Sequence, residues 1–151
     1  MRMISHSPDE TLAIGASFAE KAVPGQILAL KGDLGAGKTV FAKGFAKGLG
    51  IDDVVNSPTF TILQVYESGR LPFYHFDMYR LGEPEELEQL GYEEYFFSDG
   101  VCLVEWPEMI GELLPEDALT VEIRRGEDPD ERVIEARMPG EDPDAKPGEE
   151  D

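Results

Sequence analysis

A glycine-rich stretch in the first third of the chain carries residue types that bind phosphate. Gly32, Gly35 and Gly37 precede Lys38 and Thr39 in the pattern Gly-x4-Gly-Lys-Thr. Glycines allow backbone conformations that other residues avoid, so such a loop can wrap around a phosphate group and direct its N–H groups at the oxygens. Lys38 is then expected to reach the β- and γ-phosphates of a nucleotide, and the Thr39 hydroxyl to ligate Mg2+. The pattern predicts a phosphate-binding loop, or P-loop.

The segments on either side of this loop are those that a P-loop requires. Residues 26–31 form a short apolar run, typical of a strand buried on both faces of a mainly parallel sheet. Residues 38–49 place apolar side chains on one helical face, and Gly50 ends that helix. The positive end of the helix dipole would point at the same anion. We therefore expect nucleotide contacts from Asp33, Leu34, Gly35, Ala36, Gly37, Lys38, Thr39 and Val40.

Hydrolysis of a bound nucleotide needs a further acid near the metal ion or the attacking water. Glu105 ends the apolar run 101–104, and Asp77 ends the run 71–76. Both positions suit carboxylates beside a P-loop, and the alternative for Asp77 is an acid that caps a turn or a short helix. His75, two residues before Asp77, is interpreted as a strand histidine of the core rather than a base.

Thr59 lies between the predicted P-loop helix and the next strand, where nucleotide switch proteins sense the γ-phosphate. A simple strand-entry turn at Ser57-Pro58 explains the same residues equally well. The candidate catalytic residues are thus Lys38, Thr59, Asp77 and Glu105, and the candidate Mg2+ ligands are Thr39, Asp77 and Glu105.

The rest of the chain predicts an α/β fold of the P-loop NTPase type, with a mainly parallel central sheet, antiparallel hairpin strands and flanking helices. The predicted elements are helices at 8–22 and 83–96, a hairpin of 59–66 with 71–76, a strand at 101–106 and a closing hairpin of 119–124 with 132–137. We assign residues 1–139 to one ATPase domain. Residues 140–151 are glycine, proline and acid, so we predict a disordered tail there.

Composition excludes several classes of protein. The formal charge is −19, from 32 acidic and 13 basic residues, which disfavours direct binding of DNA or RNA. Cys102 is the only cysteine, so an intramolecular disulfide is impossible, and its apolar neighbours predict a buried, inert thiol. The chain has neither a secretory signal nor an apolar run of about 18 residues, so we expect a cytoplasmic protein without a membrane span.

Four blocks together resemble one bacterial family. They are the loop 32–39, Ser57-Pro58-Thr59-Phe60, His75-Phe76-Asp77-Met78-Tyr79-Arg80-Leu81 and Val104-Glu105-Trp106-Pro107-Glu108. In order and spacing they are similar to the TsaE (YjeE) family, the ATPases of tRNA threonylcarbamoyladenosine (t6A) biosynthesis. The resemblance covers roughly residues 7 to 114.

The resemblance implies a Mg2+-dependent ATPase that is slow alone. It would act with the TsaB and TsaD partners, which transfer threonylcarbamoyl to adenosine 37 of tRNA, so that tRNA is met only indirectly. By similarity, Thr39 and Glu105 would hold Mg2+, and Asp77 and Thr59 would lie near the γ-phosphate or water. Trp106 and the segment near Glu10 would contact the nucleotide.

Three other functions share a P-loop. A small-molecule or nucleotide kinase would need an arginine-bearing lid, and the only arginine cluster is Arg124-Arg125 in a predicted strand. A GTP-binding switch would need an Asn-Lys-x-Asp signature, which Asn56, the only asparagine, cannot supply. A non-enzymatic module with a merely stabilising P-loop is the third alternative.

Overall fold

The computed structural model describes residues 1–33, 35–52 and 62–138. A seven-stranded sheet in the order β1-β7-β6-β2-β5-β4-β3 forms its centre. The strands are β1 (Arg2–Ser5), β2 (Ile27–Lys31), β3 (Leu63–Tyr66), β4 (Phe73–Asp77), β5 (Val101–Glu105), β6 (Leu119–Arg125) and β7 (Arg132–Arg137). Strand β2 pairs in parallel with both β5 and β6, and β4 pairs in parallel with β5. The predicted mainly parallel centre is confirmed.

Antiparallel strands complete the two sides of the sheet. Strand β3 pairs antiparallel with β4, and β6 pairs antiparallel with β7, as the two predicted hairpins require. Strand β1 was not predicted, and it pairs antiparallel with β7 at the sheet edge. The carboxyl ends of the four central strands therefore meet at one edge, which is where open α/β sheets bind ligands.

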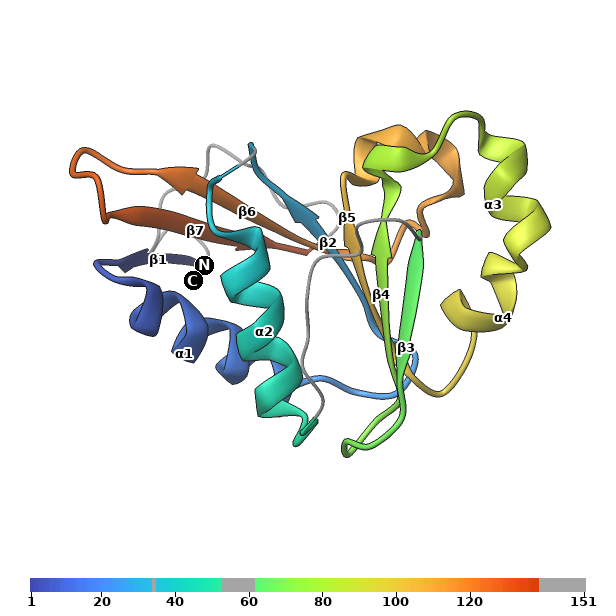
Figure 1. Ribbon diagram of the computed structural model, residues 1–151, viewed down its shortest axis with the longest axis horizontal. Coiled ribbons are helices and arrows are strands. Elements are labelled where there is room, and N and C mark those ends of the chain that lie inside the picture. The colour runs from blue at the N-terminus through green and yellow to red at the C-terminus, as the bar shows by residue number, and fades with distance from the viewer. Residues whose placement is uncertain (34, 53–61, 139–151) are drawn as a thin grey trace.

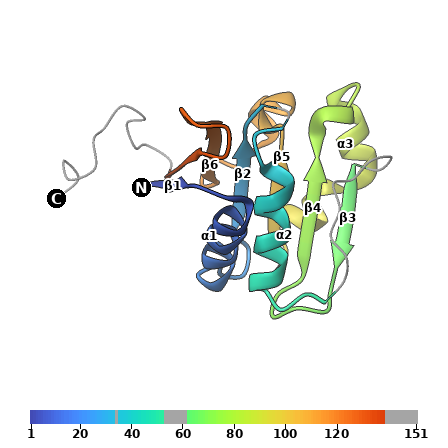
Figure 2. The same ribbon diagram turned by 60° about the vertical axis from the view of Figure 1, so that its left-hand side comes forward.

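Helices cover both faces of the sheet. Helices α1 (Pro8–Glu20) and α2 (Lys38–Gly48) lie side by side on one face, while α3 (Pro84–Leu90) and α4 (Tyr92–Phe96) lie on the far side of β4, as Figures 1 and 2 show. Short 3-10 helices η1 (Met78–Arg80), η2 (Pro107–Met109) and η3 (Gly111–Leu113) follow β4 and β5. One apolar core fills the α1–α2 side and a second fills the α3–α4 side.

Side chains cap the amino end of helix α1. The Ser7 hydroxyl accepts a hydrogen bond from the N–H of Glu10 at 3.1 Å, and the Glu10 carboxylate accepts one from the N–H of His6 at 2.5 Å. Pro8 occupies the first helical turn, where its missing N–H costs nothing. These contacts fix where the chain turns from β1 into α1.

The predicted helix at 83–96 is wrong as a single element. Gly91 has φ of +76° and separates α3 from α4. A left-handed glycine ends a helix because its backbone can turn away and satisfy the last carbonyls. The apolar periodicity continues through Gly91 because both short helices pack on the same core, in which Leu87, Tyr92 and Phe96 are buried.

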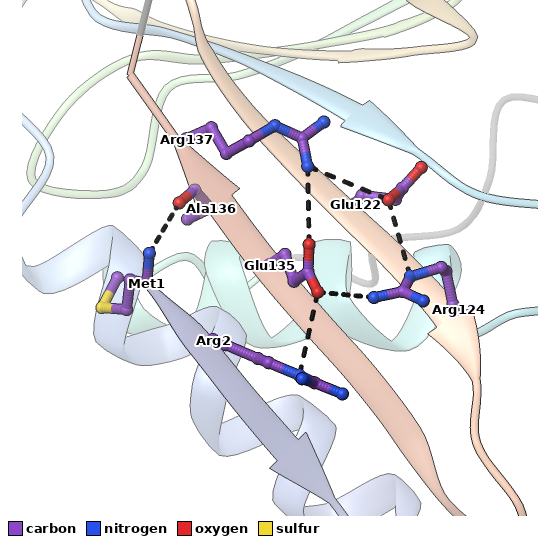
Figure 3. Close-up of polar contacts among 7 residues, drawn as sticks. All are labelled: Met1, Arg2, Glu122, Arg124, Glu135, Ala136 and Arg137. Atoms are coloured by element: carbon purple, nitrogen blue, oxygen red, sulfur yellow. Dashed lines mark hydrogen bonds and ion pairs between the residues drawn. The ribbon is translucent and has the colours of Figure 1, made fainter. Parts of the chain in front are cut away.

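The face of β6 and β7 away from α1 and α2 carries charged side chains. Val121, Ile123 and Ile134 point into the α1–α2 core, so the residues between them point outward. Figure 3 shows the outer side chains as a ladder of ion pairs in which Glu135 meets Arg124 at 2.5 Å and Arg137 at 3.5 Å. Exposed pairs of this kind contribute little stability, so they keep this sheet face polar rather than holding the fold together.

Cys102 is buried in β5, as predicted. Burial raises the pKa of its thiol to about 12, so the side chain is a neutral part of the core.

A candidate nucleotide site at the carboxyl edge of the sheet

The predicted P-loop connects the end of β2 to the start of α2. Gly35 and Gly37 have φ of +80° and +109°, which is the left-handed region that glycine adopts without strain. Gly37 is the N-cap of α2 and makes no side-chain capping bond, because it has no side chain. The amino end of α2 thus offers backbone N–H groups and the positive end of its dipole, as an anion site requires.

Two arginines that were not predicted as site residues flank this loop. Arg125 and Arg132 are register partners on β6 and β7. The Arg132 guanidinium donates a hydrogen bond to the carbonyl oxygen of Ala36 at 2.9 Å, and a Cβ built on Gly35 would lie 2.7 Å from the guanidinium of Arg125. Since 96 residues separate Ala36 from Arg132, no local pattern indicates the contact.

Lys38 turns inward from the first residue of α2. Its side chain is 6% exposed, and Nζ lies 3.6 Å from the centroid of the Trp106 ring, a cation–π contact. Nζ has no hydrogen-bond acceptor within the described part of the chain. Burial lowers the pKa of Lys38, and the carboxylate of Glu105 is the strongest of the groups that oppose this shift. The ammonium therefore sits beside acidic groups with its donors unused.

The conformation of Trp106 explains why its ring meets Lys38. Trp106 has φ of +58°, the only positive value for a non-glycine residue within the ranges that the structure describes. Left-handed backbone is costly for a bulky side chain and concentrates at functional sites. The ring also packs against Tyr79 with centroids 5.0 Å apart. Trp106 thus links the turn after β5 to the turn after β4.

The two predicted carboxylates lie next to each other. Asp77 and Glu105 are paired residues at the ends of the parallel strands β4 and β5. Burial raises the pKa of Asp77, and the charge of Glu105 raises it further. One oxygen of Asp77 accepts a hydrogen bond from the N–H of Tyr79 at 3.0 Å, so the capping role considered for Asp77 is confirmed and one oxygen remains.

These residues fit a magnesium ion that is shared with phosphate. Within the described residues, no group of three or more histidine, cysteine, aspartate or glutamate side chains could hold a metal ion alone. Mg2+ is normally held by one or two carboxylates together with substrate phosphates and water. Asp77 and Glu105 supply two carboxylates, and Thr39 follows Lys38 in the first turn of α2. Lys38 Nζ, a buried donor without an acceptor, matches the phosphate that would complete the site.

A pocket of about 70 Å³ lies beside the amino end of α2. Its lining residues come from the start of α1, the P-loop, α2 and the β6–β7 hairpin, namely Ser7, Pro8, Thr11, Gly37, Val40, Asp130 and Arg132. Val40 therefore faces a pocket next to the loop. Glu10 is exposed and is not among the residues that line this pocket, and its carboxylate accepts a hydrogen bond at the start of α1. Asp33 is exposed and Ala36 is buried, while Leu34 and Thr59 lie outside the described residues.

Comparison with known proteins places this geometry in a family. The family model "Threonylcarbamoyl adenosine biosynthesis protein TsaE" matches residues 5–134, which include both strand-end carboxylates and the whole P-loop. The chain belongs to the TsaE family. The resemblance drawn from four sequence blocks is confirmed, and the match extends beyond them to the β6–β7 hairpin that carries Arg125 and Arg132.

Relatives of this TsaE-family chain cover most of its length. A tRNA threonylcarbamoyladenosine biosynthesis protein TsaE of Bacillus subtilis is 56% identical over 128 residues, which is 85% of this chain and 79% of that protein. One of Treponema pallidum is 43% identical over 124 residues, covering 82% and 91%. The crystal structure of YdiB from Bacillus subtilis matches with a TM-score of 0.81 and 47% identity, over 93% of this chain and 86% of that one.

No helix within residues 1–33, 35–52 and 62–138 combines the length and the apolar character needed to cross a bilayer.

Proposed function

We propose that this TsaE-family protein binds Mg2+-ATP at the turn between β2 and α2 and hydrolyses it. The observation that carries the proposal is Lys38, whose buried ammonium lies at the amino end of α2 beside two carboxylates and lacks an acceptor. Phosphate oxygens would supply acceptors for Lys38 and for the backbone N–H groups of the loop. No other described residue combines a buried positive charge with unused donors.

Each residue would have a separate task in hydrolysis. Lys38 would donate to the phosphates, while Thr39, Asp77 and Glu105 would hold the metal ion at the carboxyl edge of the sheet. Mg2+, when bound, supplies positive charge that offsets the charge developing on the phosphate oxygens. Glu105 would also position the attacking water, since it is the more buried of the two carboxylates, at 4% exposed. Thr59 stays a candidate for sensing the γ-phosphate.

The adenosine half of the nucleotide would lie toward the pocket beside α2. Gly37 and Val40, at the start of α2, line that pocket, and so do Asp130 and Arg132 of the β6–β7 hairpin. A nucleotide placed this way runs from the two carboxylates, past Lys38, to the β6–β7 hairpin. Glu10 lies in the first turn of α1, and its nucleotide contact stays a proposal. Trp106 would border the phosphate end through its contact with Lys38.

The biological role that we propose is support of t6A formation. Membership of the TsaE family places the chain in threonylcarbamoyladenosine biosynthesis. We propose that it acts in the cytoplasm with TsaB and TsaD partners, which carry out transfer to tRNA, and that ATP hydrolysis by this chain drives turnover of that complex. The chain has 151 residues, and its P-loop fold accounts for nearly all that are described, so a substrate domain for tRNA has no place within them.

Reconstituted t6A formation tests the role. TsaB, TsaD, tRNA and threonylcarbamoyl donor are incubated with ATP and with the wild-type chain, with Lys38→Ala or with Lys43→Ala. Lys43 lies on the same helix but is exposed, so it is a matched control. We expect multiple turnovers with the wild type and with Lys43→Ala, and loss of turnover with Lys38→Ala. Equal t6A formation without the chain would contradict the role.

One observation favours a kinase as the alternative function. Arg125 and Arg132 lie beside the loop, and a kinase needs arginines close to the phosphates. Incubation with ATP and a panel of nucleosides and sugars separates the two functions. Release of inorganic phosphate without a phosphorylated acceptor supports an ATPase, whereas a phosphorylated acceptor would support the kinase.

A further inference from the structure

Among the residues that the structure describes, His75 makes one polar contact, and it is with the proposed metal-binding carboxylate, Glu105. His75 is completely buried in β4, and its Nε2 lies 2.5 Å from Oε2 of Glu105. The register explains the contact: His75 pairs with Leu103 across the parallel strands, so its side chain is on the same face as Glu105, two residues further along β5. The pair therefore connects the interior of the sheet with its carboxyl edge.

The imidazole ring is held in place by packing. It stacks on Phe73, two residues earlier on β4, with centroids 5.8 Å apart and planes 13° from parallel. Phe73 is itself fully buried and packs against Phe45 of α2. The other ring nitrogen, Nδ1, has no hydrogen-bond partner in the described part of the chain. All of the hydrogen bonding of this buried ring is thus directed at Glu105.

We propose that His75 is a positioning residue that fixes the Glu105 carboxylate for Mg2+. This inference rests on the proposed function. A carboxylate has two oxygens, and a rigid donor on Oε2 stops the group from rotating and leaves Oε1 for the metal ion. Partners of this kind behind a metal ligand orient the ligand and raise metal affinity, and their loss typically lowers affinity or activity by about 10- to 100-fold. His75 touches neither metal nor nucleotide in this arrangement.

A purely structural histidine would behave differently. If the ring only fills the core, its replacement lowers the stability of the fold and leaves the Mg2+ requirement of the folded protein unchanged. If it positions Glu105, its replacement raises the Mg2+ concentration needed while ATP binding without Mg2+ stays the same, since Lys38 and the loop are untouched. The Mg2+ dependence therefore separates the two roles.

Two amide variants of His75 distinguish a positioning role from a purely structural one. The side-chain nitrogen of glutamine can take the place of Nε2, whereas that of the shorter asparagine takes the place of Nδ1. His75→Gln therefore keeps a donor toward Glu105, and His75→Asn loses it, although both place an amide in the same buried site. Cys102→Ala is the control, because Cys102 is buried on β5 in the other core and faces away from the site.

The measurement is fluorescence of Trp106, the only tryptophan, which contacts Lys38. ATP is titrated in EDTA, and Mg2+ is then titrated at saturating ATP, for full-length protein whose folding is checked by circular dichroism. We expect His75→Asn to raise the half-saturating Mg2+ concentration about 10- to 100-fold with unchanged affinity for ATP in EDTA. His75→Gln and Cys102→Ala are expected to stay within about threefold of wild type.

Two results would overturn the inference. One is an Mg2+ dependence of folded His75→Asn equal to that of wild type, and the other is an equal loss of ATP affinity with and without Mg2+. If His75→Asn does not fold, the comparison moves to His75→Gln, where a Mg2+ half-saturation raised as far as that of Glu105→Gln would overturn the proposed donor role. If the fluorescence of the wild-type protein does not respond to ATP, the proposed function is contradicted. The role of His75, which rests on that function, is then contradicted as well.

Discussion

Lys38 carries a charge that the described residues only partly compensate. Burial lowers its pKa, and its ammonium rests on the Trp106 ring beside Glu105 and Asp77 rather than on a hydrogen-bond acceptor. A buried polar group without a partner costs about 1–3 kcal/mol in proteins, and more when it is charged. This unsatisfied group lies at the amino end of α2, beside two carboxylates, which is the arrangement behind our proposal that the site binds Mg2+ and phosphate.

Glu105 gives the first prediction, at the residue scale. Glu105→Gln keeps the shape and the contact with His75 but removes the charge that we expect to hold metal and water. Hydrolysis should fall about 10- to 1000-fold, while ATP binding in EDTA should persist. Phosphate release measures the effect, with the exposed Glu112→Gln as control. Unchanged hydrolysis in Glu105→Gln would rule out this role.

At the scale of elements, strand order creates the site. Lys38, Asp77 and Glu105 follow or end three different parallel strands, and the order β2-β5-β4 brings them to one edge. Their positions at the ends of apolar runs are visible in the sequence, which is why these residues could be predicted. The order of the strands comes from long-range packing, so the sequence alone did not reveal which neighbours would touch.

The contacts that were missed share this long-range character. His75 and Glu105 are 30 residues apart, and Ala36 and Arg132 are 96 apart. His75 also resembles an ordinary core histidine, because burial in a strand is common to both roles. Strand β1 was missed since it has only four residues and depends on pairing with β7. Local propensity specifies elements of this size poorly.

A glycine contact between α1 and α2 sets the position of the P-loop helix. A Cβ on Gly44 would lie 2.0 Å from the carbonyl oxygen of Leu12, and one on Gly15 would lie 2.4 Å from that of Phe41. Close approach of the two helices therefore requires glycine at the crossing. Because α2 begins at Lys38, any shift of this helix moves the lysine that we propose binds phosphate.

Gly44→Ala tests this packing. Helix propensity alone would favour alanine by about 1 kcal/mol, but the clash with backbone forces the helices apart, and overpacking of a core costs about 1–3 kcal/mol. We expect a net destabilisation of up to about 2 kcal/mol in urea unfolding, with a change of less than about 0.5 kcal/mol for the exposed Lys47→Ala. If Gly44→Ala were more stable than wild type, α1 and α2 could move apart without a loss of folding free energy, which would contradict this expectation.

The charge of the whole molecule bears on which phosphate-containing molecules it can bind directly. A net charge of −19 repels an extended nucleic acid backbone, whereas a single nucleotide needs only the local donors of the P-loop. Six of the acidic residues lie in 140–151, outside the described residues, where the predicted disordered tail remains a prediction.

Binding of tRNA by the chain alone is therefore expected to be undetectable at physiological salt. Fluorescence anisotropy of labelled tRNA, with and without TsaB and TsaD, provides the measurement. Because any association should come through those partners, the signal should change only when they are present. A micromolar dissociation constant for the isolated chain would show that tRNA contact is direct, and a steep salt dependence would locate it at phosphates.

The most direct test of the account is calorimetric titration of Mg2+-ATP into wild type, Lys38→Ala and Lys43→Ala. The account predicts saturable binding by wild type and by Lys43→Ala, and an affinity at least about tenfold weaker for Lys38→Ala, since charge-assisted hydrogen bonds contribute about 1.5–3 kcal/mol. Equal affinities for all three proteins, or no binding by the folded wild type, would contradict it.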